Sequence, residues 1–107
     1  MIICTPEYAF GIPGTLKNAL DWTVSSGDFW GKPVAAISAS PLASGGDKAH
    51  ASLLQTLTAL GANVPAGGKL IIPMIKKKLN ANGDVVDAET LQALKSVLDA
   101  LTQTSEI

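Results

Sequence analysis

Residues 1–22 read MIICTPEYAFGIPGTLKNALDW and join an apolar run to a helical pattern. The apolar run Met1–Thr5 stops at Pro6, which has no backbone N–H to donate and cannot continue a central strand. Apolar residues then recur at helical spacing, behind a proline and a glycine that suit a first helical turn. The segment therefore predicts a strand, a loop, and a helix over about Gly14–Val24.

The same alternation of apolar run and helix occurs again further along the chain. Val34–Ile37 is a continuous apolar run of the kind found in buried parallel strands, and a loop of small residues over Ser38–Gly46 follows it. Asp47 is expected to cap the next helix, whose leucines share one side and which meets a glycine stop at Gly61. Leu70–Ile72 is the third expected strand.

An irregular segment separates this third strand from the last helix. Residues 73–86 lack regular spacing, and Asn82-Gly83 favours a tight reversal between Leu79 and Val85. Asp87 is expected to cap the helix that follows.

The last expected helix completes the fold class. Its apolar stripe consists of Leu91, Leu94, Leu98 and Leu101, and the tail Thr102–Ile107 is expected to fray. Three buried strands that alternate with helices predict an α/β protein with a parallel sheet, a single domain over residues 1–107.

The composition excludes several classes of function. Of 107 residues, 8 are lysine and none is arginine, against 9 aspartates and glutamates, so the formal net charge is −1. Such a surface does not attract nucleic acid or anionic lipid. The single cysteine, Cys4, cannot form an internal disulfide and indicates a reduced compartment. Since we find neither a signal peptide nor a membrane span, we expect a cytoplasmic protein with no nucleic-acid or membrane partner.

Cys4 and His50 are the conceivable nucleophile and base of a hydrolase. Cys4 lies inside an expected strand, the chain has no G-x-S-x-G elbow, and His50 is more simply a polar residue on the first turns of a helix. One histidine and one cysteine without paired spacing cannot build a tetrahedral metal site. We therefore expect neither hydrolase chemistry nor a metal centre.

Thr5–Trp22 closely resembles the T-P-E-Y-N-x-x-I-P-G-x-L-K-N-A-[IL]-D-W signature of NADPH-dependent FMN reductases, a family with chromate reductases, quinone reductases and azoreductases among its members and relatives. Gly31–Val34 resembles the family's G-K-P-V strand. Ser38–Pro41 and Gly45-Gly46 resemble its small-residue flavin loop, and Leu79–Asp87 with the last helix is similar to its C-terminal segment. The resemblance covers nearly the whole chain.

The resemblance implies a flavodoxin-like three-layer fold with sheet order 2-1-3-4-5 and FMN at the carboxyl ends of the strands. This chain would be the C-terminal part of that domain, truncated to strands 3–5 with their helices. The N-terminal half, with the loop that holds the FMN phosphate, would be missing. Smaller departures are Ala9 in place of asparagine, Leu42 in place of glycine, and Lys48 in place of arginine.

The family pattern also implies which residues lie against the flavin. They are Pro6, Glu7, Tyr8 and Ala9 after the first strand, and Ser40, Pro41, Gly45 and Gly46 after the second. No catalytic side chain is expected, because the flavin carries the chemistry: NAD(P)H would reduce bound FMN, which would pass the hydride to quinones or similar small acceptors. Lys76–Lys78 could contact the additional phosphate of NADPH, or form an ordinary solvated loop.

Without the phosphate loop we expect weak or no flavin binding, unless another chain supplies the missing half. The alternative is a non-catalytic interaction module or relic that pairs through its exposed first strand. Partners would then be a second copy or a complementing N-terminal fragment. Trp22, Phe29 and Trp30 form either an exposed aromatic patch or ordinary core, while Asn18 and Asp21 are expected to fix helix packing.

Overall fold

The computed structural model describes residues 1–105 and contains a parallel sheet with strand order β1-β2-β3. The α/β class and the parallel sheet expected from the sequence are confirmed. In chain order the elements are β1 (Ile2–Thr5), α1 (Gly14–Asp21), β2 (Ala35–Ala39), α2 (Asp47–Ala59), the 3₁₀ turn η1 (Ala66–Gly68), β3 (Lys69–Ile72), the 3₁₀ turn η2 (Ile75–Lys77) and α3 (Ala88–Ser105).

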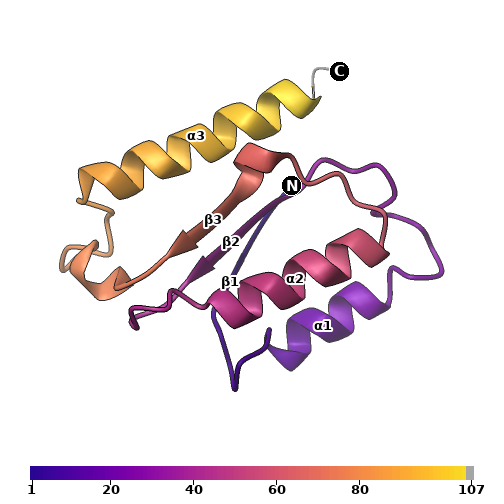
Figure 1. Cartoon of the computed structure of the whole chain (residues 1–107), viewed down its shortest axis with the longest axis horizontal. Coiled ribbons are helices and arrows are strands. Elements are labelled where there is room, and N and C mark those ends of the chain that lie inside the picture. Colours follow the sequence, from indigo (N-terminus) through magenta and orange to yellow (C-terminus); the bar gives the residue numbers. More distant parts are fainter. Residues whose placement is uncertain (106–107) are drawn as a thin grey trace.

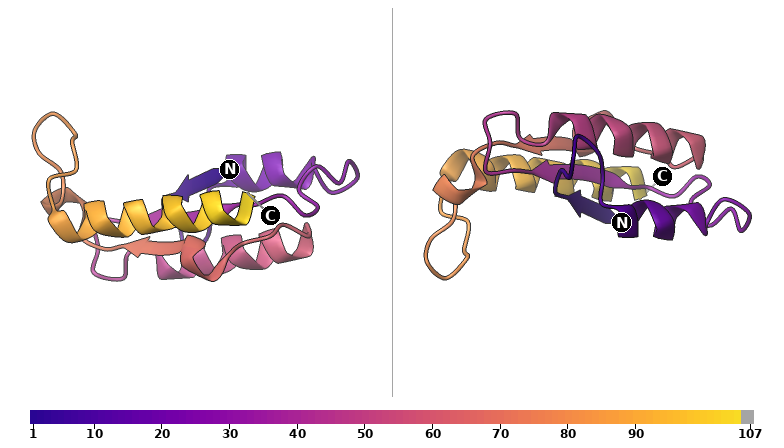
Figure 2. Two further views of the ribbon diagram at one scale, coloured as in Figure 1. Left: turned by 90° about the horizontal axis from the view of Figure 1, so that it is seen from above. Right: turned by 90° about the horizontal axis from the view of Figure 1, so that it is seen from below.

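The elements form three layers, with α1 and α2 on one face of the sheet and α3 on the other (Figures 1 and 2). Alternate residues of the central strand face opposite layers. Ala36 packs with the buried residues Leu20, Phe29, Val34, Leu53 and Leu57, whereas Ala35 and Ile37 pack with Ile72, Val97 and Leu101. Each buried leucine contributes about 2 kcal/mol through its loss of contact with water, so both faces of β2 hold the layers together.

Helix α1 is shorter than the sequence pattern predicts. The expected end at Val24 is wrong, because regular helix stops at Asp21. The Thr23 hydroxyl donates to the Leu20 carbonyl at 2.7 Å, and the Thr23 amide donates to the same oxygen at 3.0 Å. A threonine that bonds its own backbone in this way closes the helix with a tighter turn.

Strand β2 is longer than its apolar run. It begins at Ala35 and continues past the expected end at Ile37, because Ser38 pairs with Ile71 and Ala39 with Ile72. The sequence pattern predicts both residues in the small-residue loop, because the continuous apolar run ends at Ile37. Ser38 is nevertheless fully buried, since its hydroxyl donates to the Gly45 carbonyl at 2.7 Å.

Helix α2 takes its N-terminal cap from a distant loop. The expectation that Asp47 is the cap is wrong, because Asp47 is the first helical residue and Gly46 occupies the cap position with φ 78°. Glycine has no side chain to accept a helix N–H. Instead, Glu7 Oε1 accepts the Ala49 amide at 2.8 Å. A residue that follows β1 therefore supplies the acceptor for the helix that follows β2.

Two turns predicted from glycines are confirmed. Gly61 has φ 77° just past α2, and the Ala62 amide donates to the Leu57 carbonyl at 3.0 Å, as in a glycine-terminated helix. Gly83 has φ 83° in the reversal that brings Leu79 opposite Val85.

Helix α3 confirms one expectation and corrects two. The Asp87 carboxylate accepts the Thr90 amide at 2.9 Å and the Thr90 hydroxyl at 2.7 Å, so it caps the helix as expected. The apolar stripe is only partly buried: Leu94 and Leu101 face the sheet with Val97, while Leu91 and Leu98 are 50% and 49% exposed. The expected fraying from Thr102 is wrong for residues up to Ser105, because the helix continues to that residue. Residues 106–107 lie outside the described part of the chain.

We predict that the Asp87 cap makes stability depend on pH. The Thr90 hydroxyl and amide, with a smaller effect of Lys78, lower the pKa of the Asp87 carboxyl. Because the folded-state pKa is the lower one, the stabilisation is present at neutral pH and is lost as the pH falls below about 4. Asp87→Ala should therefore lower the thermal unfolding midpoint at pH 7, and the difference from wild type should shrink below pH 4. An equal effect of Asp84→Ala, in the preceding turn, would contradict this role.

We predict that removal of the Glu7 carboxylate destabilises α2. Glu7→Ala should reduce the free energy of unfolding by about 1 kcal/mol, as expected for the loss of a helix cap. Glu7→Gln should lose less, because an amide oxygen still accepts the Ala49 amide. Urea unfolding measures the change, and hydrogen exchange at Ala49 should accelerate in Glu7→Ala. If the exposed control Glu89→Ala caused the same loss, the cap would be unimportant.

Candidate flavin site

The loops that follow the three strands meet at the carboxyl edge of the sheet. Each loop has a proline at or near the end of its strand: Pro6 after β1, Pro41 after β2 and Pro73 after β3. Backbone hydrogen bonds join the second and third loops, since Ser40 N–H donates to Ile72 O at 3.1 Å and Ile75 N–H donates to Ser40 O at 2.9 Å. Ligands of open parallel sheets bind at this edge, so these loops define the candidate site.

The first loop contains a tight reversal in a strained conformation. Tyr8 N–H donates to Gly11 O at 2.9 Å, and Gly11 N–H donates to Tyr8 O at 3.0 Å. Between them Ala9 and Phe10 have φ values of 49° and 66°. A two-residue turn of this kind favours asparagine or glycine, so an alanine there is strained. The turn holds the Tyr8 and Phe10 side chains largely exposed at the edge of the sheet.

The second loop passes so close to β3 that only glycine fits. A Cβ at Gly45 would lie 2.5 Å from Ile71 Cγ2 and 3.1 Å from the Pro73 nitrogen, at a φ of 66°. A Cβ at Gly46 would lie 3.6 Å from the Glu7 Cβ. The missing side chain of Gly45 therefore lets the second loop pack against β3, whereas Gly46 is favoured by its positive φ of 78° and not by lack of space.

The structure brings the two predicted groups of flavin residues together, but in different roles. Pro6, Tyr8, Ala9 and Pro41 are exposed at the edge of the sheet, whereas Ser40, Gly45 and Gly46 are buried and Glu7 is half-buried. The buried residues shape the loops, and the exposed residues are available to a ligand. Sequence reasoning missed two exposed apolar side chains of the same edge, Phe10 and Leu42. Their only signal was large apolar residues in loops of otherwise small or polar residues.

The residues present fit the ring of a flavin and not its phosphate. Tyr8, Phe10 and Leu42 offer exposed apolar surface to a planar ring. The loops over 6–13 and 40–46 contain no lysine, arginine or histidine. The amide of Ala49 in the first turn of α2, which could otherwise bind an anion, already donates to the Glu7 carboxylate.

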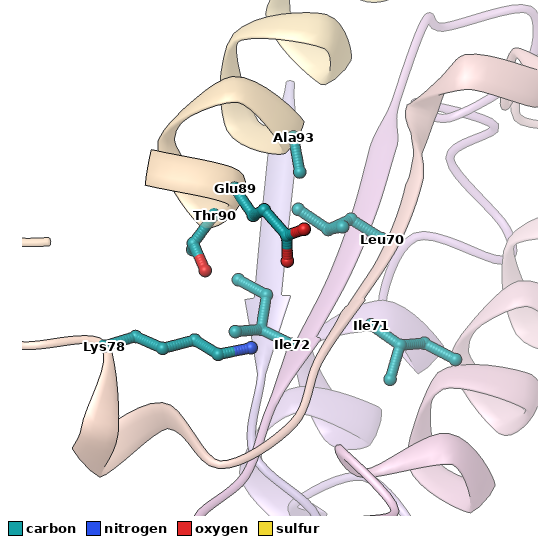
Figure 3. Close-up of a pocket in the computed structure, with 7 residues that line it drawn as sticks. All are labelled: Leu70, Ile71, Ile72, Lys78, Glu89, Thr90 and Ala93. Carbon is teal, nitrogen blue, oxygen red and sulfur yellow. The ribbon is translucent and has the colours of Figure 1, made fainter. Parts of the chain in front are cut away.

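The lysines Lys76–Lys78 lie in the loop that follows β3, at and just after the turn η2. Lys76 and Lys77 are exposed, and Lys78 lines a pocket of about 210 Å³ between β3 and the first turn of α3 (Figure 3). Its other lining residues include Ile72, Glu89 and Thr90, and Figure 3 shows the Glu89 and Lys78 side chains on either side of Ile72. Cofactor pockets are larger, about 300–1,000 Å³, so this pocket does not hold a flavin.

The candidate nucleophile and base of a hydrolase do not form a pair. Partial desolvation by its neighbours raises the pKa of the Cys4 thiol, although the residue keeps exposed surface, so the thiol is a weak nucleophile at neutral pH. His50 is buried, and its Nε2 donates to the Ala36 carbonyl at 3.0 Å, so it ties α2 to β2. His50 lies in the first turn of α2 as expected, where β2 offers it this carbonyl.

The aromatic residues near α1 divide between surface and core. Phe29 is buried in the core beside α1 and α2, whereas Trp22 and Trp30 are 78% and 80% exposed. Asp21 forms an exposed ion pair with Lys17 at 2.8 Å, and Asn18 and Trp22 line a shallow pocket with it. Within residues 1–105, no helix is long and apolar enough to span a membrane, and no three His, Cys, Asp or Glu side chains gather as a metal site.

Comparison with known proteins shows the family to which the chain belongs. The family model of the NADPH-dependent FMN reductases matches residues 1–77. The chain is 36% identical over 103 residues to a quinone reductase of Escherichia coli, which covers 94% of this chain and 55% of that protein. It is 31% identical over 103 residues to an NAD(P)H-dependent FMN reductase of Pseudomonas aeruginosa, covering 94% of this chain and 56% of the relative.

A solved structure extends the agreement to the fold. The flavoenzyme NAD(P)H:(acceptor) oxidoreductase of Paracoccus denitrificans superimposes with a TM-score of 0.84 at 31% identity, over 98% of this chain and 59% of that one. The fold is therefore flavodoxin-like, as the resemblance implied. The chain spans little more than half the length of these relatives. With a family match across most of its residues, the chain belongs to the NADPH-dependent FMN reductase family.

Proposed function

We propose that this chain supplies the ring side of an FMN site in an NAD(P)H-dependent reductase of quinones or similar small acceptors. The observation that carries the proposal is the meeting of the β1 and β2 loops at the carboxyl edge, with Tyr8, Phe10 and Leu42 exposed there. The family to which the chain belongs supports FMN and NAD(P)H as cofactor and co-substrate.

The residues of the two loops would orient the ring. When bound, FMN supplies the hydride transfer between NAD(P)H and the acceptor. The strained turn at Ala9 and Phe10 fixes the position of the Tyr8 ring, and Glu7 fixes this turn relative to α2. The close packing at Gly45 holds the second loop against Ile71 and Pro73. The protein would therefore act by positioning the ring, without a catalytic side chain of its own.

A truncated and impaired site is part of the proposal. The chain matches only 55% of the Escherichia coli quinone reductase, and its β1 and β2 loops offer no cation to a phosphate. We propose that FMN binds weakly to this chain alone. A non-catalytic interaction module is the second candidate, and the free edge of β1 favours it. A flavin titration separates the two candidates, because a pure interaction module binds no flavin.

Riboflavin and FMN distinguish ring binding from phosphate binding. We predict that addition of the protein quenches the fluorescence of both flavins, and that the two affinities are similar and weak. Riboflavin has the same ring as FMN and no phosphate. Tyr8→Ala, at a side chain that is 63% exposed, should weaken both about fivefold, equivalent to the ~1 kcal/mol of an aromatic contact. Trp22→Ala removes a more exposed aromatic residue at the far end of α1 and should leave both affinities unchanged.

Three results of the titration would contradict the proposed site. Absence of saturable binding for both ligands would leave only the interaction module. A preference for FMN over riboflavin of about tenfold or more, or FMN retained through dialysis, would show a phosphate site in this chain. Equal losses of flavin affinity in the Tyr8 and Trp22 variants would mean that the flavin ring does not bind at Tyr8.

Ala9→Asn should stabilise the turn that carries Tyr8. Asparagine tolerates the left-handed conformation that Ala9 adopts with φ 49°, so the free energy of unfolding should rise by about 0.5–1 kcal/mol. Thermal or urea unfolding measures the gain. The matched control is Ala43→Asn, at an exposed loop position without a positive φ, which should change stability little. A gain no larger than the control's would mean that the turn is not strained.

A further inference from the structure

The reversal between Leu79 and Val85 carries the pair Asn82-Gly83 at its tip. In both views of Figure 2 this loop, drawn in orange before α3, projects away from the three layers. Residues 80–84 are all exposed. The side chains at the tip therefore lie in solvent, where water and hydroxide reach them.

Asn82 is the one asparagine of the chain that a glycine follows, since Asn18, Asn63 and Asn80 precede larger residues. Its side chain is exposed and has no hydrogen-bond partner among the described residues. The side-chain carbon Cγ of an asparagine can close a five-membered ring with the backbone nitrogen of the next residue. Asn82 is free to turn toward that nitrogen.

Gly83 leaves this nitrogen accessible. A Cβ placed on Gly83, which has a φ of 83°, would meet no atom within 4 Å beyond its chain neighbours. Because glycine has no side chain, nothing shields its nitrogen from Cγ of Asn82. The Gly83 N–H donates to the Asn80 carbonyl at 3.0 Å, and this bond must open first. Opening an exposed turn uncovers no apolar core, so its free-energy cost is small.

We propose that Asn82 converts spontaneously to aspartate and isoaspartate. The Gly83 nitrogen attacks Cγ of Asn82, so that a new N–Cγ bond forms and the Cγ–Nδ2 bond breaks. The proton of the attacking nitrogen leaves with the side-chain amide as ammonia. Water then opens the resulting succinimide: cleavage of the new bond gives aspartate, and cleavage of the original peptide bond gives isoaspartate. Water is the only co-reactant, and nothing is oxidised or reduced.

Asn80 lies in the same exposed loop and is held differently. Its Oδ1 accepts the amide of Asn82 at 2.9 Å and the amide of Asp84 at 3.0 Å. Both bonds must break before its side chain can turn toward the nitrogen of Ala81, and the Ala81 methyl group shields that nitrogen. Asn80 is therefore a matched internal control for Asn82, and its two bonds also restrain the tip of the loop.

Isoaspartate would disturb the loop more than aspartate does, because it lengthens the main chain by one carbon atom. The base of the loop depends on the length of its tip: Asn80 N–H donates to Asp84 O, and Val86 N–H donates to Lys78 O, each at 2.9 Å. We expect isoaspartate at position 82 to break these two bonds and aspartate to keep them. The connection between β3 and α3 would therefore loosen as isoaspartate accumulates.

Incubation of the whole chain in mildly alkaline buffer, without flavin, tests the proposal. Peptide mass spectrometry locates each amide that has become a carboxyl group, and an isoaspartate-specific carboxyl methyltransferase measures isoaspartate. We expect Asn82 to convert about tenfold faster than Asn80, because glycine leaves the attacking nitrogen unshielded. In the isoaspartyl fraction, hydrogen exchange at Val86 should be about fivefold faster, the factor that corresponds to one lost hydrogen bond. Exchange at Ala62, in the glycine turn after α2, should be unchanged.

Three variants sharpen the test. Asn82→Gln should form no isoaspartate, because glutamine would have to close a larger ring. Asn80→Ala should accelerate conversion at Asn82 about fivefold, because the Asn82 amide loses its acceptor and the tip opens more often. Asn63→Ala removes another exposed asparagine, outside the loop, and should leave the rate at Asn82 unchanged.

Several results would overturn the proposal. They are conversion of Asn80 as fast as that of Asn82, isoaspartate in Asn82→Gln, or an Asn80→Ala variant that converts no faster than Asn63→Ala. Unchanged exchange at Val86 in the isoaspartyl fraction would overturn the loosening of the loop.

Discussion

The structure depends on burial of the central strand on both faces. Strand β2 is covered by α2 on one side and by α3 on the other, and Ala35 and Ala36 lose all contact with solvent. Small side chains at these positions let both helices approach the sheet closely. Both helical layers therefore depend on β2, which contributes to the core on each face of the sheet. The two outer strands have only one neighbour each among the described residues.

The Glu7 carboxylate links this scaffold to the candidate site. It crosses from the loop after β1 to the amide of Ala49 in the first turn of α2, a separation of 42 residues in the chain. Gly46 must be a glycine because the loop has a positive φ there, and a glycine cannot cap the helix itself. The same contact therefore holds two loops in register and occupies a helix terminus that could otherwise bind a phosphate.

The sequence predicts the elements of the fold better than it predicts their ends. Alternation of apolar runs and helices indicated all three strands, and Gly61 and Asp87 marked a helix end and a helix start correctly. The errors arise where a side chain bonds a backbone group that no local pattern reveals. The Thr23 hydroxyl donates to the Leu20 carbonyl where α1 ends early. The Glu7 carboxylate, and not that of Asp47, accepts an amide of the first turn of α2.

The site shows the same division between local and long-range information. The family signature indicated the loop over Pro6–Ala9, but spacing could not show that Glu7 faces α2 while Tyr8 faces outward. Nor could it show that Leu98 borders an apolar groove of about 520 Å³ over β1, because a leucine stripe looks equally buried along its length. Burial depends on which elements cover the helix, and the described elements leave Leu98 49% exposed.

The candidate site and the open groove meet at the same strand. The β1 loop lacks a cation, and among the described residues β1 has one unpaired edge and one uncovered face. Carboxyl ends of parallel strands meet at one edge of a sheet. The Tyr8 turn therefore lies at the end of the strand that the described part of the chain leaves open at one edge and on one face. The contact of Glu7 with the Ala49 amide ties this outer strand to α2, so the position of the turn depends on the covered face of the sheet and not on the open one.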